Sequence, residues 1–250
     1  MKVDAKAVIE EANELYERGE YEKTVTTIES AFDAIGGERV IRDGDRAELY
    51  AIFAWSKYHL KDFDQARRMS DMSRAMFSVL GTRCRAAIAA YVDNDEVTLR
   101  KIVDELPNDL GILNVMVVCA RQEGSVFGRD DVIACALGSE GTGKERAHIL
   151  NNAGRFFLAK SRGDEDLVLA LGFFTAAAGL YGSDGNWHHR GGLHYWRSVV
   201  LEKLLGKEAS VGAATHSLEM WEKAALLDPT NPGFRKNLVN ARKRLAELTS

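Results

Sequence analysis

The 250-residue sequence has few prolines and few cysteines, three of each. Because proline interrupts helices, its scarcity beside abundant Ala, Leu, Glu, Lys and Arg predicts a mostly helical protein. The cysteines, Cys84, Cys119 and Cys135, are odd in number, form no Cys-x-x-Cys pair and lie among apolar residues. This pattern argues against a disulfide framework and against a zinc finger. We expect reduced, buried thiols and no metal site.

Long apolar runs and a strong charge of one sign are also missing. No apolar stretch approaches the roughly 20 residues of a membrane-spanning helix, and residues 1–6 have no apolar signal region. The formal net charge of -4 argues against a dedicated nucleic-acid binder, which usually carries a basic excess. We therefore expect a cytoplasmic protein that has no membrane association and that does not bind nucleic acid.

The sequence does contain apolar residues at helical spacing, separated by short polar corners. Ala12, Leu15 and Tyr16 share one face of a helix expected over residues 5–18, and Gly19-Glu20 ends it. A second amphipathic helix follows from Tyr21. Further helices are predicted at about 80–92, 96–106, 109–122, 129–137, 143–161, 165–181, 187–205, 208–227 and 232–248.

The second helix of each predicted pair begins at a nearly regular interval. The expected first residues are Tyr21, Phe63, Val97, Val132, Leu167 and Ala209, which are 42, 34, 35, 35 and 42 residues apart. A repeat of this size is typical of a helical solenoid, in which stacked hairpins bury one continuous core. We assign residues 232–248 to a capping helix that covers the open end.

Particular residues in these hairpins resemble the tetratricopeptide repeat family. They are Leu15, Gly19, Tyr21 and Ala31 in the first unit, Tyr50, Phe53, Ala54, Phe63 and Ala66 in the second, and Trp221, Ala224 and Leu227-Asp228-Pro229 in the sixth. The two 42-residue intervals and the sequence Leu150-Asn151-Asn152 are similar to the longer repeats of kinesin light chains. The resemblance implies an all-α, right-handed superhelical solenoid of about six antiparallel hairpins, with residues 1–250 as a single domain.

Polar residues on the predicted first helices are the candidate binding residues. The tripeptide Ile-Leu-Asn occurs twice, at Ile112-Leu113-Asn114 and, 37 residues later, at Ile149-Leu150-Asn151. On the second of these helices Asn152 and Arg155 share a face. Asparagine can both donate to and accept from a peptide backbone, and arginine suits a carboxylate or phosphate. In the resembled family these helices line the concave groove. The expected contacts to a partner protein or peptide are Asn114, Asn151, Asn152, Arg155, Tyr195 and Arg197, and a solvated polar face is the alternative.

Two further stretches suggest other functions. Gly138–Glu145 fits the phosphate-loop pattern G-x-x-x-x-G-K, but Glu145 stands where a magnesium-binding hydroxyl is needed, and helix is predicted before it. His188, His189 and His194 are not at ligand spacing. We expect Trp187, Tyr195 and Trp196 to pack between hairpins, and the nearby glycines to allow either close helix crossing or a helix start. The main hypothesis is a protein-interaction adaptor that is not an enzyme and needs no cofactor. The alternatives are a nucleotide-binding protein or enzyme that uses the 138–145 loop, and an RNA-binding repeat protein. Exposed repeat ends can also self-associate.

Overall fold

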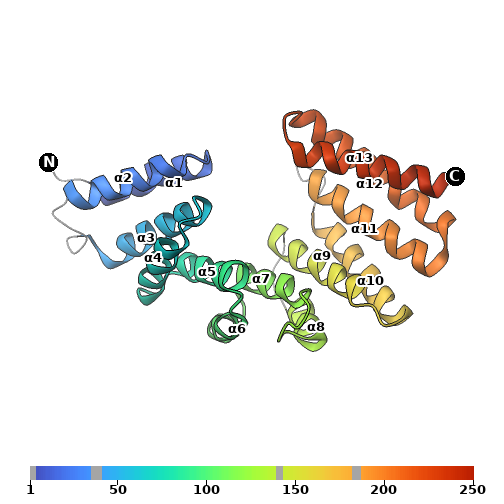
Figure 1. Ribbon diagram of the computed structural model, residues 1–250, viewed down its shortest axis with the longest axis horizontal. Helices are drawn as coiled ribbons and strands as arrows, with labels where there is room; N and C mark the ends of the chain where they lie inside the picture. The colour runs from blue at the N-terminus through green and yellow to red at the C-terminus, as the bar shows by residue number, and fades with distance from the viewer. Residues whose placement is uncertain (1–3, 35–40, 139–142, 182–186) are drawn as a thin grey trace. The chain divides into compact units, whose positions relative to one another are not determined.

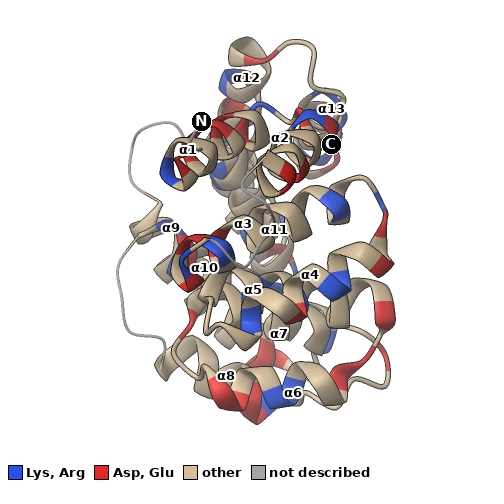
Figure 2. Cartoon of the chain, turned by 90° about the vertical axis from the view of Figure 1, so that its left-hand side faces the viewer, with Lys and Arg blue, Asp and Glu red and all other residues tan. Residues whose placement is uncertain are grey.

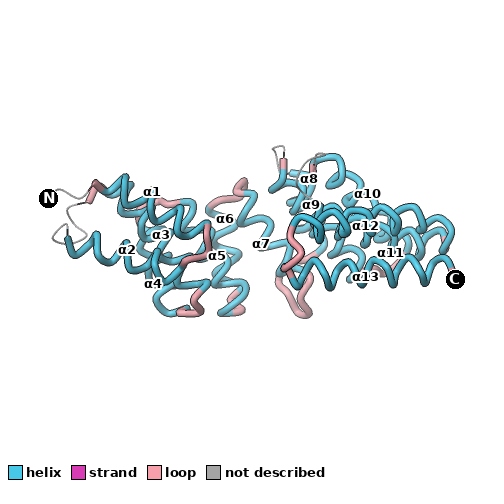
Figure 3. The backbone as a smooth tube through the Cα atoms, turned by 90° about the horizontal axis from the view of Figure 1, so that it is seen from above, coloured by secondary structure: helices cyan, strands magenta, loops and turns pink. Residues whose placement is uncertain are grey.

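The computed structural model describes residues 4–34, 41–138, 143–181 and 187–250. Within these ranges every regular element is a helix and no strand occurs (Figures 1 and 3). The helices are α1 (Ala5–Glu17), α2 (Tyr21–Ala34), α3 (Asp43–His59), α4 (Phe63–Ala75), α5 (Val79–Ile88), α6 (Glu96–Glu105), α7 (Leu110–Ala120), α8 (Arg129–Gly138), α9 (Lys144–Ala159), α10 (Asp164–Leu180), α11 (Trp187–Leu205), α12 (Lys207–Leu227) and α13 (Pro232–Thr249). The predicted all-α class is confirmed for the described residues.

The helix boundaries follow the predicted corners closely. The even-numbered helices α2 to α12 begin at Tyr21, Phe63, Glu96, Arg129, Asp164 and Lys207, so successive starts are 42, 33, 33, 35 and 43 residues apart. Side chains that accept backbone N–H groups begin several helices, including Asp62 before α4, Asp95 before α6 and Asp109 before α7. At the first corner Gly19 has a φ of 76°, the left-handed conformation that ends a helix at low cost to glycine.

Backbone contacts divide the chain into two compact units, residues 1–107 and 108–250. In the first unit α1 packs on α2 and α3, and α3 packs on α4 and α5. One apolar cluster of this unit is built around fully or nearly fully buried side chains: Ala12, Ile28, Leu49, Tyr50, Ile52 and Phe53. The proposed single domain over residues 1–250 stays a prediction.

In the second unit α7 and α10 pack against α9, α11 packs on α12, and α13 packs on α12 (Figure 1). Trp221 and Ala224 of α12 form a buried cluster with Ala241 of α13, and Phe234 and Leu238 pack against it. The apolar face of the last helix therefore covers the end of α12. Figure 2 shows Lys and Arg interspersed with Asp and Glu on the helices of both units.

The same interhelical hydrogen bond occurs in two helix pairs that are distant in sequence. Ser73 Oγ of α4 donates to the Ala47 carbonyl of α3 at 2.6 Å, and Ser217 Oγ of α12 donates to the Gly191 carbonyl of α11 at 2.8 Å. Donor and acceptor are 26 residues apart in both pairs, and both serines are buried. The second helix is thus fixed against the first in the same register.

The end of α5 differs from the sequence-based expectation of a plain helix to residue 92. Residues 89–93 form a π-helical turn, and Asn94 follows with a φ of 51°. The turn presents Asp93 to two arginines: the Arg67 guanidinium of α4 lies 2.5 Å from the Asp93 carboxylate, and Arg85 lies 3.4 Å away. This ion pairing lowers the pKa of Asp93, with the Arg67 hydrogen bond as the main cause.

Phe77, between α4 and α5, combines an unfavourable backbone with full exposure. Its φ is 62° and its side chain is 95% exposed. A non-glycine residue in the left-handed region costs about 1 kcal/mol or more. We expect Phe77→Gly to raise the free energy of unfolding by about 1 kcal/mol, as measured by urea denaturation. A loss of stability would mean that the exposed ring makes contacts that stabilise the fold.

Candidate functional site

A polar ladder connects α7 and α9 in the second unit. Asn152 Nδ2 of α9 donates to Asn114 Oδ1 of α7 at 2.8 Å, and Arg121, which follows α7, donates from Nη1 to Asn152 Oδ1 at 3.4 Å. These side chains meet because α7 packs directly on α9. The ladder holds both asparagines in one orientation. The Asn114 amide uses its oxygen in this hydrogen bond, so its Nδ2 group is not part of the Asn114–Asn152 contact.

An arginine stacks on a tryptophan beside the ladder. The Arg155 guanidinium of α9 lies 5.4 Å from the ring centre of Trp196 on α11, which is cation–π geometry. Burial lowers the pKa of Arg155, and the positive charge of Arg121 lowers it further. Within the described part of the chain Arg155 has no carboxylate partner. A positive, half-buried side chain without a counter-ion is suited to receive a negative or acceptor group.

Two hollows open on either side of this stacked pair. One, of about 210 Å³, is lined by Arg121, Arg155, Leu158, Ala159 and Trp196. The other, of about 310 Å³, is lined by Arg155, Gly192, Tyr195, Trp196, Trp221, Asn237 and Asn240. Neither lining contains a carboxylate. Together the hollows offer aromatic surface, amide groups and positive charge, the combination that binds an extended peptide segment.

The structure brings some of the predicted binding residues together and separates others. Arg155 and Tyr195 line the second hollow, and Asn114 and Asn152 form the neighbouring ladder. The remaining two, Asn151 and Arg197, line neither hollow. Asn151 Oδ1 and Arg197 Nε are instead buried and have no hydrogen-bond partner among the described residues.

Sequence reasoning missed several residues of this surface. Arg121 lies seven residues after Asn114, which is two helical turns along the same face, so its spacing was a usable signal. Asn237 and Asn240 are three residues apart on α13, the helix that the sequence analysis assigned only as a cap. Trp196 was expected to pack between helices, and its role as the stacking partner of Arg155 depends on how α9 and α11 cross.

Histidines from α9 and α11 gather at a separate place in this unit. His189 lies 4.4 Å from His148 and 3.9 Å from His188 between ring centres, and Tyr181 Oη is 3.0 Å from His148 Nδ1. Burial lowers the pKa of all three histidines. No three metal-binding side chains of the described residues are arranged to hold an ion. His194, the third histidine of the 187–196 stretch, lies instead 5.4 Å from His216.

The other chemical candidates were the glycine-rich loop and the cysteines. Residues 139–142 of the loop lie outside the described residues, and the stretch before it, α8, is helical as expected. Cys84, Cys119 and Cys135 form no disulfide and are buried, as predicted for these thiols. Burial raises the pKa of both Cys84 and Cys135 to about 12.

Among the helices that the structure describes, none has the length and the apolar content to cross a membrane. Comparison with protein-family models finds no match for the chain, and comparison with curated proteins finds no significantly similar sequence.

Proposed function

We propose that this chain is a protein-interaction adaptor that binds an extended segment of a partner protein on the surface formed by α7, α9 and α11. The observation that carries the proposal is the Arg155–Trp196 pair, which offers a positive charge and an aromatic ring between two hollows without any carboxylate in their linings. The pair would bind a carboxylate or carbonyl of the partner, and the Asn114–Asn152 ladder would bind its backbone.

The proposed architecture is a tetratricopeptide-like array of about six antiparallel hairpins in a right-handed superhelix, with α13 as its cap. Three features support it: the near-regular starts of the even-numbered helices, the equivalent Ser73 and Ser217 hydrogen bonds, and the apolar cover that α13 provides for α12. In such arrays the first helices of the hairpins share one face. Helices α7, α9 and α11 would be first helices, so their polar residues would line a common groove. The proposal assigns no catalytic residue and no cofactor.

Selection from a random peptide library tests the adaptor role for any partner sequence. The folded chain is immobilised, binding peptides are selected, and their affinities are measured by fluorescence anisotropy. We expect Arg155→Gln to weaken the selected peptides about tenfold, because one charge-assisted hydrogen bond is worth about 1.5 kcal/mol or more. The unfolding temperature should change little, because glutamine keeps most of the side-chain stem.

Lys203→Gln is the matched control, since Lys203 is exposed on α11 and lines neither hollow. It should bind the selected peptides as wild type does. Selection that yields no binding peptide, or peptides that bind the Arg155→Gln protein with unchanged affinity, would contradict the proposed surface.

A further inference from the structure

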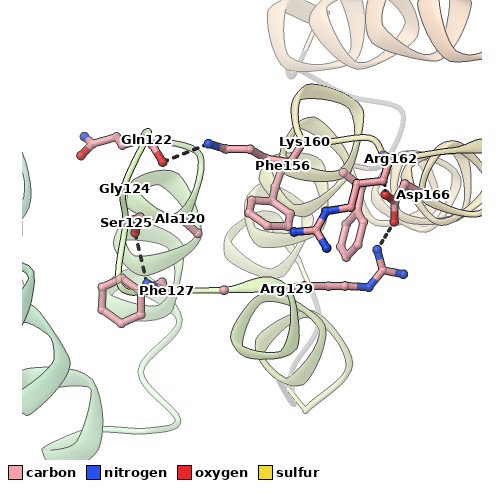
Figure 4. A pocket seen from close by; sticks show the side chains of 12 residues that line it. Ala120, Gln122, Gly124, Ser125, Phe127, Arg129, Phe156, Lys160, Arg162 and Asp166 are labelled. Carbon is pink, nitrogen blue, oxygen red and sulfur yellow. Dashed lines mark hydrogen bonds and ion pairs between the residues drawn. The ribbon is translucent and has the colours of Figure 1, made fainter.

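A third hollow of the second unit lies where α9 ends and α8 and α10 begin (Figure 4). Its volume is about 170 Å³, and its lining includes Arg129, Lys160, Arg162 and one carboxylate, Asp166. Phe156 of α9 and Lys160, which directly follows α9, line this hollow, whereas Arg155 and Leu158 on another face of α9 line the hollow beside Trp196. It is therefore separate from the proposed partner surface, and its function does not depend on that proposal.

The carboxylate of this hollow is already neutralised. Asp166 is only 5% exposed, and its Oδ1 is paired with the Arg129 guanidinium, as Figure 4 shows. Its Oδ2 accepts the backbone N–H of Arg162 at 2.8 Å. The Arg129 guanidinium also lies 4.9 Å from the ring centre of Phe157, which holds it in place. One arginine and one buried carboxylate thus form a closed, hydrogen-bonded pair.

Two positive charges of the lining remain uncompensated. Lys160 Nζ donates to a neutral acceptor, the backbone carbonyl of Gln122, at 3.2 Å. The Arg162 guanidinium forms no ion pair among the described residues, and Figure 4 shows it directed toward the ring of Phe156 inside the hollow. The nearby carboxylates Asp164 and Glu165 are exposed and are not part of the lining. The lining therefore has a net charge of +2, from three cations and one carboxylate.

We propose that this hollow binds a small oxyanion of the phosphate type, free or as a phosphate ester, with Lys160 and Arg162 as its cationic contacts. An oxyanion offers several acceptor oxygens, which suit the planar donors of arginine and the ammonium of lysine. Both cations are exposed to solvent, so the anion reaches them without any movement of the helices. Asp166 does not repel it strongly because Arg129 neutralises that carboxylate.

Titration at constant ionic strength tests this site on the intact chain. Sodium phosphate replaces sodium chloride, and thermal unfolding and isothermal titration calorimetry are followed. We expect a saturable rise in unfolding temperature, since a ligand that binds only the native state stabilises it. Arg162→Gln and Lys160→Gln should each weaken phosphate binding about tenfold, the loss typical of one charge-assisted contact.

Lys236→Gln is the control, because Lys236 is exposed on α13 of the same unit. It should leave phosphate binding unchanged. A titration with O-phosphoserine distinguishes a phosphate ester from free phosphate as the ligand. Tighter binding than that of phosphate indicates an ester, and weaker binding indicates the free anion. The proposed site is wrong if phosphate raises the unfolding temperature no more than chloride does, or if the Arg162→Gln and Lys160→Gln proteins both bind phosphate with wild-type affinity. Because Arg155 takes no part, this result is independent of the adaptor test.

Discussion

Gly154→Ala is expected to destabilise the protein by about 2 kcal/mol, the usual range for one methyl group forced into a packed core. A Cβ at this position of α9 would lie 2.7 Å from Cε1 and 2.8 Å from Cδ1 of Phe174 on α10. The Phe174 ring is fully buried, so it has no free space into which to move. The free energy of unfolding from urea denaturation, compared with wild type, measures the effect.

The same substitution elsewhere should have the opposite sign. Gly212 lies inside α12, and a Cβ there would meet no atom within 4 Å. Alanine favours a helix over glycine by about 1 kcal/mol, so Gly212→Ala is expected to raise stability by 0.5 to about 1 kcal/mol. Equal shifts for the two variants would show that helix propensity, and not the Phe174 contact, determines the outcome at Gly154.

A second glycine makes the same kind of contact in the next helix pair. A Cβ at Gly191 of α11 would lie 2.8 Å from Nε1 of Trp221 on α12. In both cases a glycine on the odd-numbered helix admits an aromatic ring of the following helix. Close helix crossing was one of two roles expected for the glycines of this stretch. The partner ring was not predicted, because periodicity identifies the buried face without identifying which side chains meet across it.

Local features of the sequence were sufficient to locate the helices. Apolar spacing places the start of α11 at Trp187, and Pro229 and Pro232 mark the connection between α12 and α13, because these signals act within a few residues. The π-helical turn at 89–93 was not predictable in this way, since its Asp93 pairs with Arg67, 26 residues earlier.

The candidate site was only partly predictable for a similar reason. Equivalent positions in two units suggested that Asn114 and the asparagines of α9 are related, and the structure joins Asn114 to Asn152. The neighbouring Asn151 takes no part in this hydrogen bond, since one residue along a helix rotates a side chain by about 100°. A helix face can be assigned from spacing, but the hydrogen-bond partner of each side chain on that face depends on the neighbouring helix.

The protein is also expected to lose stability as the pH falls from 7 to 5. The ring of His189 is stacked on Tyr181 at 5.5 Å and lies close to His148 and His188. Burial, followed by the charges of His188, His148 and Lys144, lowers the pKa of His189 to about 3. Burial, with Arg197 as the next cause, lowers the pKa of His194 to about 4.

The sign of this pH dependence follows from the pH range in which the folded and unfolded states each bind protons. In the unfolded chain a histidine titrates near pH 6.5, so it becomes protonated while the folded His189 and His194 are still neutral. The unfolded state then binds more protons, and the free energy of unfolding falls with decreasing pH. For two partly solvated histidines we expect a loss of about 2 kcal/mol between pH 7 and pH 5. Urea denaturation at several pH values measures this slope.

Substitution of one histidine separates this cause from general acid sensitivity. His189→Phe keeps an aromatic ring beside Tyr181 but removes one of several histidines whose pKa burial lowers, so the pH slope should be smaller than that of the wild type. The slope is the informative quantity, because the absolute stability at pH 7 also depends on how well the new ring packs. If the His189→Phe protein loses stability with acid as steeply as wild type, proton uptake by the unfolded state at this histidine is not the cause. A smaller slope shows that proton uptake at His189 in the unfolded state contributes to the loss of stability in acid.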